Sequence, residues 1–480
     1  MLERDSTRSL ERCDVLTNIV MSLKSNRGAL RSALIAILAL VGLRHARADE
    51  RDEAIQSLRE QIRVLDQKLR VLERKSELKE EEAASTAKTT PKVTINDKGL
   101  TLASADGANS LRLRGLLQLD ARTFFNDGGM TNNSFVLRRA RIFAEGTFAK
   151  NFAFQFVPEF AGSATSILDA NLSVTLNKAI TLKAGKFKVP VGRELLQSDP
   201  WTFFNERALP TNLVPNRDVG VQIGGDLFDG RVSYAAGVFG GVADGGSSSN
   251  SDFDNEKDVA ARIFLTPFAK SENNAFQGLG FGVSGSLGRE KTASALTSGY
   301  RTPGQQTFFR YRSATVNDGQ VWRLSPHFDY RNGPLGLTGE YVTSVVNVRP
   351  AVGSPKAELT NKAWQLAAGY VLTGENSSYS GVVPKTNFDL AGGTWGAFEV
   401  AARFEDLRVD PAAFPLFADP AASASEASTI GVGLNWYLSK AVRATFDYYQ
   451  TAFETILPVP GVGLLRQDEK ALITRFQVAF

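Results

Sequence analysis

The chain of 480 residues is long enough for two or three ordinary domains or for one large β-barrel. Hydrophobic residues make up 43% of it, and beyond the N-terminal region no stretch reaches about 18 consecutive apolar residues, which excludes a membrane-spanning helix in the mature chain. The 42 glycines and 31 phenylalanines favour many short strands and tight turns over helices.

The formal net charge of +4 comes entirely from the N-terminal region. Residues 1–48 hold eight of the 55 basic residues and four of the 51 acidic ones, so 47 of each remain in the rest of the chain. A neutral mature chain does not predict nucleic-acid binding, and its net charge does not predict anion selectivity. Any selectivity must come from where individual charges are placed.

A signal peptide is predicted over residues 1–48, with Met21 as a better translation start than Met1. The pattern consists of three basic residues, a short apolar core and a small-x-small cleavage site: Lys24, Arg27 and Arg31, then Ala33 to Leu43, then Ala46-Arg47-Ala48. The alternative is an N-terminal membrane anchor, for which an apolar core of about eleven residues is short. The mature chain is expected to begin at Asp49.

The mature chain offers little to catalysis. Cys13, the only cysteine, lies in the predicted signal peptide, so thiol chemistry and Cys-based metal sites are excluded and an oxidising compartment is indicated. His327 is the one histidine after residue 48, and no nucleophile motif stands near it. Neither a phosphate loop nor a dinucleotide fingerprint is present. We therefore predict no enzyme, no catalytic or metal-ligating residue and no cofactor.

Residues 49–82 follow a heptad pattern and are predicted to form a periplasmic coiled coil. Apolar residues occupy both seam positions in three successive heptads: Ile55, Ile62 and Leu69 at one, Leu58, Leu65 and Leu72 at the other. Three heptads are marginal alone, so we expect the coil to form where something else brings chains together. A solitary charged helix is the alternative. Residues 83–100, which are polar and contain Pro91, are predicted to be a linker.

From residue 101 to 480 the pattern changes to period two. Between Leu111 and Thr123 the residues at every second position are mostly apolar, and the residues between them are mostly charged or polar. Apolar residues facing lipid and polar residues facing a lumen are typical of tilted strands in a membrane barrel. The same alternation recurs in four further segments: 139–148, 152–160, 322–329 and 398–405. A soluble sandwich would also alternate, but its polar face would meet external water.

The connections between these segments alternate between short and long. Tight turns are expected near residues 149–150, 177–178, 229–230, 332–333 and 439–440, and long loops at 189–217, 240–258, 289–319, 347–360, 407–426 and 452–468. Short periplasmic turns and long outer loops produce this asymmetry. Segment 374–393 is the exception, because it is long although it lies at the end of the barrel where tight turns are expected. The count predicts an all-β fold, a transmembrane antiparallel β-barrel of about 16 strands behind the N-terminal coiled-coil helix.

The last strand ends on an aromatic residue. Phe476, Val478 and Phe480 face one side, a pattern that resembles the signal read by the barrel-assembly machinery. The expected partners are therefore that machinery and outer-membrane lipids.

Six segments in order and spacing carry a family resemblance: 135–141 (FVLRRAR), 185–192 (GKFKVPVG), 205–207 (NER), 369–375 (GYVLTGE), 396–399 (GAFE) and 433–437 (GLNWY). Together they make residues 95–480 resemble the phosphate-selective porin O and P family. The resemblance implies a homotrimeric, sixteen-stranded outer-membrane porin whose lumen carries an arginine ladder for small anions such as phosphate.

The family's anion residues carry over only in part. Arg138 and Arg139 match its paired arginines on the second strand, and Arg112 matches a basic position on the first. Phosphate-transporting members have an arginine where this chain has Leu116, and a lysine before the constriction-loop tryptophan. Here that loop reads Ser198-Asp199-Pro200-Trp201. Two fewer cations and one added carboxylate should weaken a tight phosphate site, which needs convergent charge-assisted donors.

Pore-lining and anion-binding candidates come from strand parity, the resemblance and the loop 189–217, which is predicted to fold inward as the constriction. They are Arg112, Arg114, Arg122, Arg138, Arg139, Arg141, Lys183, Arg193, Arg207, Arg262, Arg323, Arg403 and Arg443. The alternative is that these cations pair with inward acids such as Asp120, Glu145, Asp169, Glu399 and Asp447 and brace the wall. Residues 244–252 are loosely similar to a cation site but fit better as a mobile outer loop.

The sequence thus predicts a passive, anion-preferring diffusion channel for small hydrophilic solutes. The alternative is a weakly selective general porin that acts as an envelope tether through its coiled coil.

Overall fold

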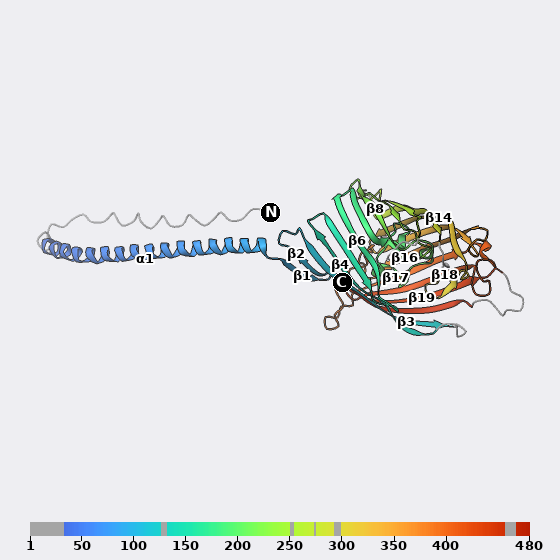
Figure 1. Ribbon diagram of the computed structural model, residues 1–480. Helices are drawn as coiled ribbons and strands as arrows, with labels where there is room; N and C mark the ends of the chain where they lie inside the picture. Colours follow the sequence, from blue (N-terminus) through green and yellow to red (C-terminus); the bar gives the residue numbers. More distant parts are fainter. Residues whose placement is uncertain (1–32, 126–131, 250–253, 273–274, 292–298, 457–466) are drawn as a thin grey trace. The chain divides into compact units, whose positions relative to one another are not determined.

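The computed structural model describes residues 33–125, 132–249, 254–272, 275–291, 299–456 and 467–480 (Figure 1). The predicted signal peptide therefore lies mostly outside the described residues. The chain divides into two compact units, residues 1–87 and 88–480, and each is described by itself.

From residue 33 onward, where its description begins, the first unit forms one helix, α1 (Ala33–Thr89). Its six heptad seam residues are all exposed in the isolated chain, from 45% for Ile55 to 66% for Leu72. Apolar side chains at this spacing form one stripe, because residues three and four apart lie on the same face of a helix. In the part of the chain that the structure describes, no helix is both long and apolar enough to cross a membrane.

The second unit is a closed antiparallel barrel (Figure 1) of sixteen strands, which confirms the predicted all-β barrel and its strand number. Each strand pairs with its neighbours in chain order, and β20 closes the barrel by pairing with β3. The strands are β3 (Ser110–Phe125), β4 (Ser134–Phe148), β5 (Phe152–Glu159), β6 (Ser166–Asn177), β7 (Ile180–Lys188), β8 (Arg217–Leu227), β9 (Val232–Phe239), β10 (Asp258–Leu265), β11 (Leu279–Lys291), β14 (Val316–Asn332), β15 (Leu335–Arg349), β16 (Ala357–Val371), β17 (Ala397–Arg408), β18 (Glu426–Tyr437), β19 (Val442–Glu454) and β20 (Glu469–Ala479).

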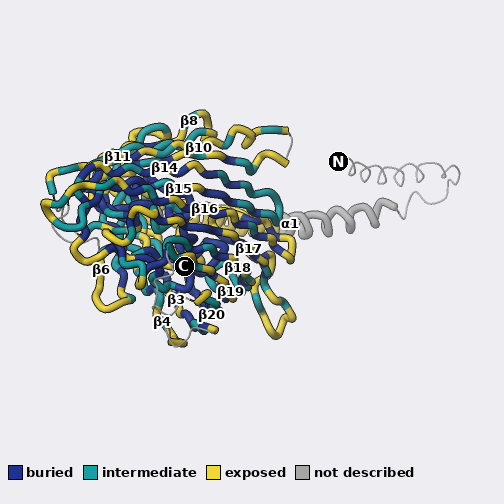
Figure 2. The backbone as a smooth tube through the Cα atoms, turned by 90° about the vertical axis from the view of Figure 1, so that its right-hand side faces the viewer, coloured by how far each residue is buried: buried dark blue, intermediate teal, exposed yellow. Residues whose placement is uncertain are grey.

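Burial alternates along these strands as the period-two pattern predicts (Figure 2). In β14 the side chain of Arg323 is 2% exposed and that of its neighbour Leu324 is 46% exposed. In β17 the same contrast separates Arg403 from Phe404. Successive side chains of a strand point to opposite faces, so the apolar residues cover the outside of the barrel and the charged ones fill its inside.

A β-bulge in β4 breaks this alternation. Gln118 of β3 lies opposite Arg139, and the next residue, Leu119, lies opposite Leu137, so Arg138 has no cross-strand partner. The extra residue shifts the parity of the strand. Arg138 and Arg139 therefore both point into the lumen, where each contacts residues of the inner loop described below.

The segment before the barrel is a β-hairpin rather than the predicted linker. α1 continues to Thr89, and β1 (Lys92–Asn96) then pairs with β2 (Gly99–Ala103). β2 pairs with the first residues of β3, and β20 pairs with the same strand from Leu116 onward. Every residue of β1 is exposed.

The connections alternate in length, so the end of the barrel with short connections is called the turn end and the other the loop end. The turn end carries short connections such as 178–179 and 333–334, together with Phe480, and the loop end carries the opposite connections. Half of the expected long loop 347–360 is strand, because β15 continues to Arg349 and β16 begins at Ala357. The exceptional segment is confirmed as long, since 25 residues, 372–396, join β16 to β17 at the turn end.

Short elements lie within the long connections of the loop end. They are α2 (Arg193–Leu196), η1 (Asp199–Trp201), η2 (Leu209–Leu213), β12 (Tyr300–Arg301), β13 (Thr307–Phe309) and η3 (Pro411–Ala413).

Candidate pore and its constriction

The connection between β7 and β8, residues 189–216, folds into the barrel and is called the inner loop. Three of its apolar side chains, Val191, Leu209 and Leu213, are at most 1% exposed. They pack in one cluster with strand residues such as Val342 and with the aromatic residues of β12 and β13. Burying this apolar surface against the wall fixes the loop inside the lumen.

Buried side chains of the barrel wall hold the backbone of the inner loop. Glu340 of β15 accepts a hydrogen bond from the amide of Arg193 at 2.6 Å, and Glu405 of β17 accepts one from Leu209 at 2.6 Å. Asp447 accepts a further bond from the amide of Asn205. Four wall side chains donate to loop carbonyls: Arg403 to Glu206, Asn435 to Phe203, Arg443 to Thr202 and Gln477 to Pro200. Strands β15 to β20 thus use their inward polar groups to satisfy loop backbone, and this side of the lumen is filled.

The long turn-end segment 372–396 supports the inner loop from the opposite end of the barrel. Gln197 donates to the carbonyl of Tyr379 at 3.0 Å, and the guanidinium of Arg193 lies 3.9 Å from the centre of the Tyr379 ring. A Cβ on Gly381 would come within 2.5 Å of the Trp201 ring, so only glycine allows this approach. Segments from both ends therefore meet in the lumen.

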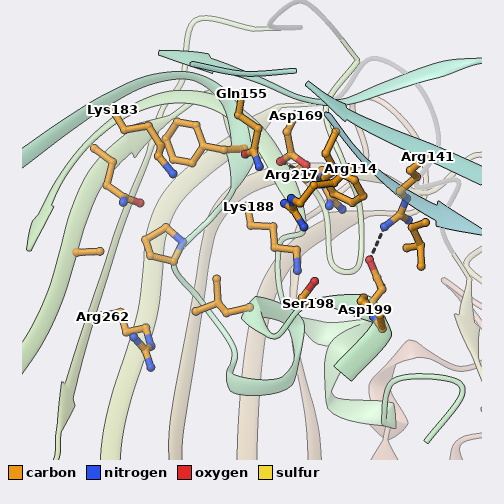
Figure 3. A pocket seen from close by; sticks show the side chains of 18 residues that line it. Arg114, Arg141, Gln155, Asp169, Lys183, Lys188, Ser198, Asp199, Arg217 and Arg262 are labelled. Atoms are coloured by element: carbon orange, nitrogen blue, oxygen red, sulfur yellow. Dashed lines mark hydrogen bonds and ion pairs between the residues drawn. The ribbon is translucent and has the colours of Figure 1, made fainter. Parts of the chain in front are cut away.

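Two cavities lined by described residues lie beside the inner loop. The first, of about 390 Å³, is called the turn-side cavity (Figure 3). Six basic and two acidic side chains line it: Arg114, Arg141, Lys183, Lys188, Arg217 and Arg262, with Asp169 and Asp199. Apolar residues of the inner loop, Pro190, Leu196 and Pro200, form another part of its lining.

The second cavity, of about 460 Å³, is called the loop-side cavity because loop-end segments line it. Seven basic and three acidic side chains contribute: Arg138, Arg139, Arg141, Arg207, Arg217, Arg301 and Arg310, with Asp199, Glu206 and Asp244. Both cavities thus have an excess of positive charge, although residues 49–480 as a whole carry equal numbers of basic and acidic side chains.

The two cavities share three lining residues, Arg141, Asp199 and Arg217. These residues come from β4, from the inner loop and from the start of β8, and they mark the candidate constriction. Arg141 binds Asp199 and also Glu159, the latter at 2.6 Å (Figure 3). Arg217 pairs with Asp169 at 3.2 Å. Each wall arginine at this point is therefore held by a carboxylate of the wall.

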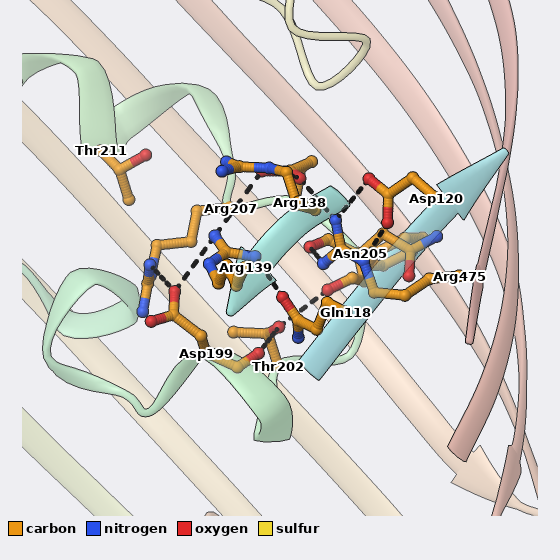
Figure 4. Close-up of polar contacts among 12 residues, drawn as sticks. Gln118, Asp120, Arg138, Arg139, Asp199, Thr202, Asn205, Arg207, Thr211 and Arg475 are labelled. Atoms are coloured by element: carbon orange, nitrogen blue, oxygen red, sulfur yellow. Dashed lines mark hydrogen bonds and ion pairs between the residues drawn. The ribbon is translucent and has the colours of Figure 1, made fainter. Parts of the chain in front are cut away.

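Asp199 is the centre of a larger ion-pair network (Figure 4). Besides Arg141, it contacts Arg207 at 2.5 Å and Arg139 at 3.2 Å. Glu206 occupies a similar position nearby, bound by Arg138 at 2.6 Å and by Arg475 at 2.7 Å. Figure 4 shows Arg475 also reaching Asp120 of β3, at 2.6 Å.

The arginines keep both loop acids ionised. Burial raises the pKa of Asp199, but the charges of Arg139, Arg207 and Arg141 outweigh it and hold that pKa well below its ordinary value. The pKa of Glu206 is likewise held well below its ordinary value by Arg138 and Arg475 against the effect of burial. Opposite charges within a few ångströms favour the charged form of an acid.

Three cations of the turn-side cavity make no ion pair with any carboxylate of the described residues. The Lys188 ammonium donates to the carbonyls of Leu195 at 2.6 Å and Gln197 at 3.0 Å. Lys183 and Arg262 contact aromatic rings, at 5.1 Å and 5.0 Å from the ring centres. No carboxylate in the part of the chain that the structure describes neutralises these three side chains.

The predicted candidates fall into two groups. Those that line a cavity are Arg114, Arg138, Arg139, Arg141, Lys183, Arg207 and Arg262. Those that line neither are Arg112, Arg122, Arg193, Arg323, Arg403 and Arg443.

The second group has other contacts. Arg112 is exposed near the turn end, Arg122 pairs with Asp120, and Arg193 pairs with Asp329. Arg323, Arg403 and Arg443 are on the inner face, as parity predicts, but they are at most 2% exposed beneath loop segments. Parity alone distinguishes inside from outside, and it does not show what covers an inward side chain.

Besides Arg217, which lines both cavities, four basic residues of this region are absent from the predicted set. Lys188, Arg301 and Arg310 line a cavity, and Arg475 joins the wall to the inner loop. Parity in β20 would have placed Arg475 inside, since it alternates with outward Phe476.

Residues 244–249, expected to belong to a mobile outer loop, are partly buried in the lumen. Asp244 is 7% exposed, pairs with Arg323 at 2.7 Å and accepts a hydrogen bond from Ser344 at 2.7 Å. Two buried donors on the wall thus hold the start of this loop, which sequence composition could not show. Residues 250–252 lie outside the described residues.

His327 is an inward residue of β14, and its Nδ1 lies 3.0 Å from the Ser325 carbonyl. Its ring stacks on Phe264 with 5.9 Å between centres. Within the described ranges, no group of three or more His, Cys, Asp or Glu side chains is arranged to hold a metal ion.

Several solved structures are similar to this chain. They include the outer membrane channel DcaP of Acinetobacter baumannii (12% identity, TM-score 0.49, covering 78% of this chain and 98% of that one) and OmpT of Vibrio cholerae (13%, 0.49, 78% and 98%). An anion-selective porin from Comamonas acidovorans is 11% identical, with a TM-score of 0.46 and coverage of 78% and 100%. No curated protein sequence matched significantly.

The match to a protein-family model extends over residues 111–480, which is the whole barrel apart from the first residue of β3. The barrel is therefore an outer-membrane channel, and the chain belongs to the phosphate-selective porin O and P family.

Proposed function

We propose that this porin is a passive, anion-preferring diffusion channel for small hydrophilic solutes, with inorganic phosphate among them. The observation that carries the proposal is the excess of basic over acidic side chains in both cavities, six to two and seven to three. Charged side chains at a narrow point set ion selectivity in such pores. Ions close to a low-dielectric wall are also affected more strongly than they would be in open water.

The cations without a carboxylate partner, Lys183, Lys188 and Arg262, support this anion preference separately from the number of charged residues. A cation already bound to a carboxylate presents little net charge to a solute, whereas these three have no such partner among the described residues. They come from β7 and β10, on the side of the lumen that the inner loop leaves open.

The assembly of the channel is part of the proposal. We infer a homotrimer in the outer membrane, with the helical seam of residues 49–82 forming a periplasmic coiled coil and the signal peptide removed. The exposed apolar seam supports association of this segment. Phe476, Val478 and Phe480 are proposed as the signal for the barrel-assembly machinery, and Phe476 and Phe480 are each 48% exposed on the outer face of the closing strand.

The reversal potential of the purified protein in a planar bilayer across a potassium chloride gradient tests the function. Chloride should carry more current than potassium. Neutralising the unpaired cations in the variant K183Q/R262Q should shift the reversal potential toward potassium. Lys270→Gln, which removes an exposed cation of a turn outside both cavities, is the matched control and should change nothing. A wild-type channel that prefers potassium would exclude the proposal.

A further inference from the structure

One carboxylate lies where a permeating anion would have to pass. Asp199 lines both cavities, is 6% exposed and is contacted by Arg139, Arg141 and Arg207. The three guanidinium groups come from β4 and from the inner loop itself. Guanidinium groups that converge on one point are the usual protein ligands of carboxylates and phosphates.

We propose that Arg139, Arg141 and Arg207 form an oxyanion-binding site that the Asp199 carboxylate occupies as a tethered competitor. A small carboxylate or phosphate passes the constriction by exchanging with this side chain, and it is not retained there. Asp199 thereby sets the specificity of the channel. This inference rests on the proposed anion pathway and deepens it.

The site does not depend on Asp199 for its shape, because each arginine has an anchor of its own. Arg139 donates to Gln118 at 2.7 Å, and Arg141 binds Glu159 at 2.6 Å. Arg207 donates to the carbonyl of Gln197 at 2.7 Å and to that of Glu194 at 3.1 Å. Donors fixed in advance lose little freedom when an anion arrives. Removing the carboxylate should therefore leave a preformed site.

The site also has a donor that Asp199 does not use. The Nε of Arg139 is buried and has no hydrogen-bond partner. A carboxylate offers two oxygens and contacts three arginines here, whereas phosphate offers four oxygens and can accept from more donors at once. A buried donor without a partner carries a free-energy cost that such a ligand would relieve.

The test compares wild type with Asp199→Asn, which keeps the size of the side chain and removes its charge. Chloride current through single channels is measured while inorganic phosphate is titrated. We expect half-block at a phosphate concentration about tenfold lower, or less, in D199N than in wild type, since one removed competitor charge adds charge-assisted contacts for the ligand. Only conducting channels are counted, so each event comes from a folded barrel. Asp199→Ser removes the same charge and must give the same result.

Two further variants show that the gain comes from this site. In D199N/R207Q the extra block should fall back toward the wild-type level, because one of the three guanidinium groups is gone. Asp329→Asn is the matched control. It removes the buried carboxylate that pairs with Arg193, and both residues lie outside the two cavities, so phosphate block should stay at the wild-type level.

Three results would overturn the inference. They are a D199N channel blocked no more strongly than wild type, an equal gain in D329N, and a gain that R207Q does not reverse. Failure of the anion pathway itself would instead be seen in the wild-type reversal potential.

Discussion

The ring of Phe480 lies against the α-carbon of Gly115, so closely that a Cβ on Gly115 would come within 2.8 Å of the ring. The backbones of the two residues also bond reciprocally, with Gly115 donating to the Phe480 carbonyl at 2.8 Å and accepting from its amide at 3.0 Å. The last residue of the chain is thus fixed to the first strand of the barrel, beside the point where β20 closes the cylinder.

Replacing Gly115 with valine should weaken this closure, because the added side chain overlaps the ring. Overpacking of a tight contact costs about 1–3 kcal/mol. The variant should lose its folded form on gel electrophoresis at a lower temperature than wild type. In the double variant G115V/F480L the smaller terminal side chain should restore part of the lost stability. Equal heat resistance of G115V and wild type would contradict the contact.

Arg475 is expected to be the most sensitive of the buried arginines. It joins β20 to Asp120 of β3 and to Glu206 of the inner loop. Arg475→Gln takes one arginine partner from each of two buried carboxylates, and breaking a buried ion pair costs at most about 3–5 kcal/mol. We expect a lower unfolding temperature and noisier open-channel current, since the loop loses an anchor. Arg408→Gln, which removes an arginine whose side chain is 66% exposed, should have little effect on either measurement.

Acid should weaken the barrel in a defined range of pH. The pKa of Glu206 is depressed in the folded state, so its ion pairs contribute full stability above the unfolded value of about 4.3 and lose it as the pH falls through the folded value. The temperature of thermal unfolding should therefore be constant from pH 8 to about pH 5 and fall in stronger acid. The variant Glu206→Gln should be less stable than wild type at neutral pH, and it should lose less stability than wild type on acidification. A wild-type profile that falls steadily between pH 8 and pH 5 would contradict the assignment.

The exposed seam of α1 predicts contacts between chains. A cysteine at Leu65, which is 63% exposed on the seam, should form interchain disulfides upon oxidation of the mature protein. Gln67 lies about 200° further around the helix, so a cysteine there should crosslink far less. The mature chain is expected to contain no other cysteine, which makes the comparison direct. Equal crosslinking at both positions would argue against a coiled coil.

The period-two pattern was sufficient for the wall of the barrel, because side-chain direction in a strand depends only on neighbouring positions. Arg403 and Phe404 were assigned to opposite faces for this reason, and the structure agrees. The bulge at Arg138 could not be read from alternation, since one inserted residue reverses the parity of everything before it. The family resemblance, rather than the pattern, identified that residue as a candidate.

The interior depended on contacts between segments far apart in the chain. Residues 189–217 were correctly expected to fold inward, but nothing in the sequence showed that Glu340, Glu405 and Asp447 would bind the loop backbone. For the same reason Arg403 and Arg443 were expected to line a pore and instead lie beneath the loop. Whether an inward charge meets water or backbone is decided by tertiary packing.

Because β15 to β20 hold the inner loop, the open passage is eccentric, and its opposite sides differ in chemistry. At the turn-side cavity the strands present Arg114, Lys183 and Arg262, whereas the inner loop presents Pro190, Leu196 and Pro200. A solute with one charged end and one apolar end would pass in a fixed orientation, with its charged end facing the strands. The channel would then sort molecules by their polarity profile as well as by their size.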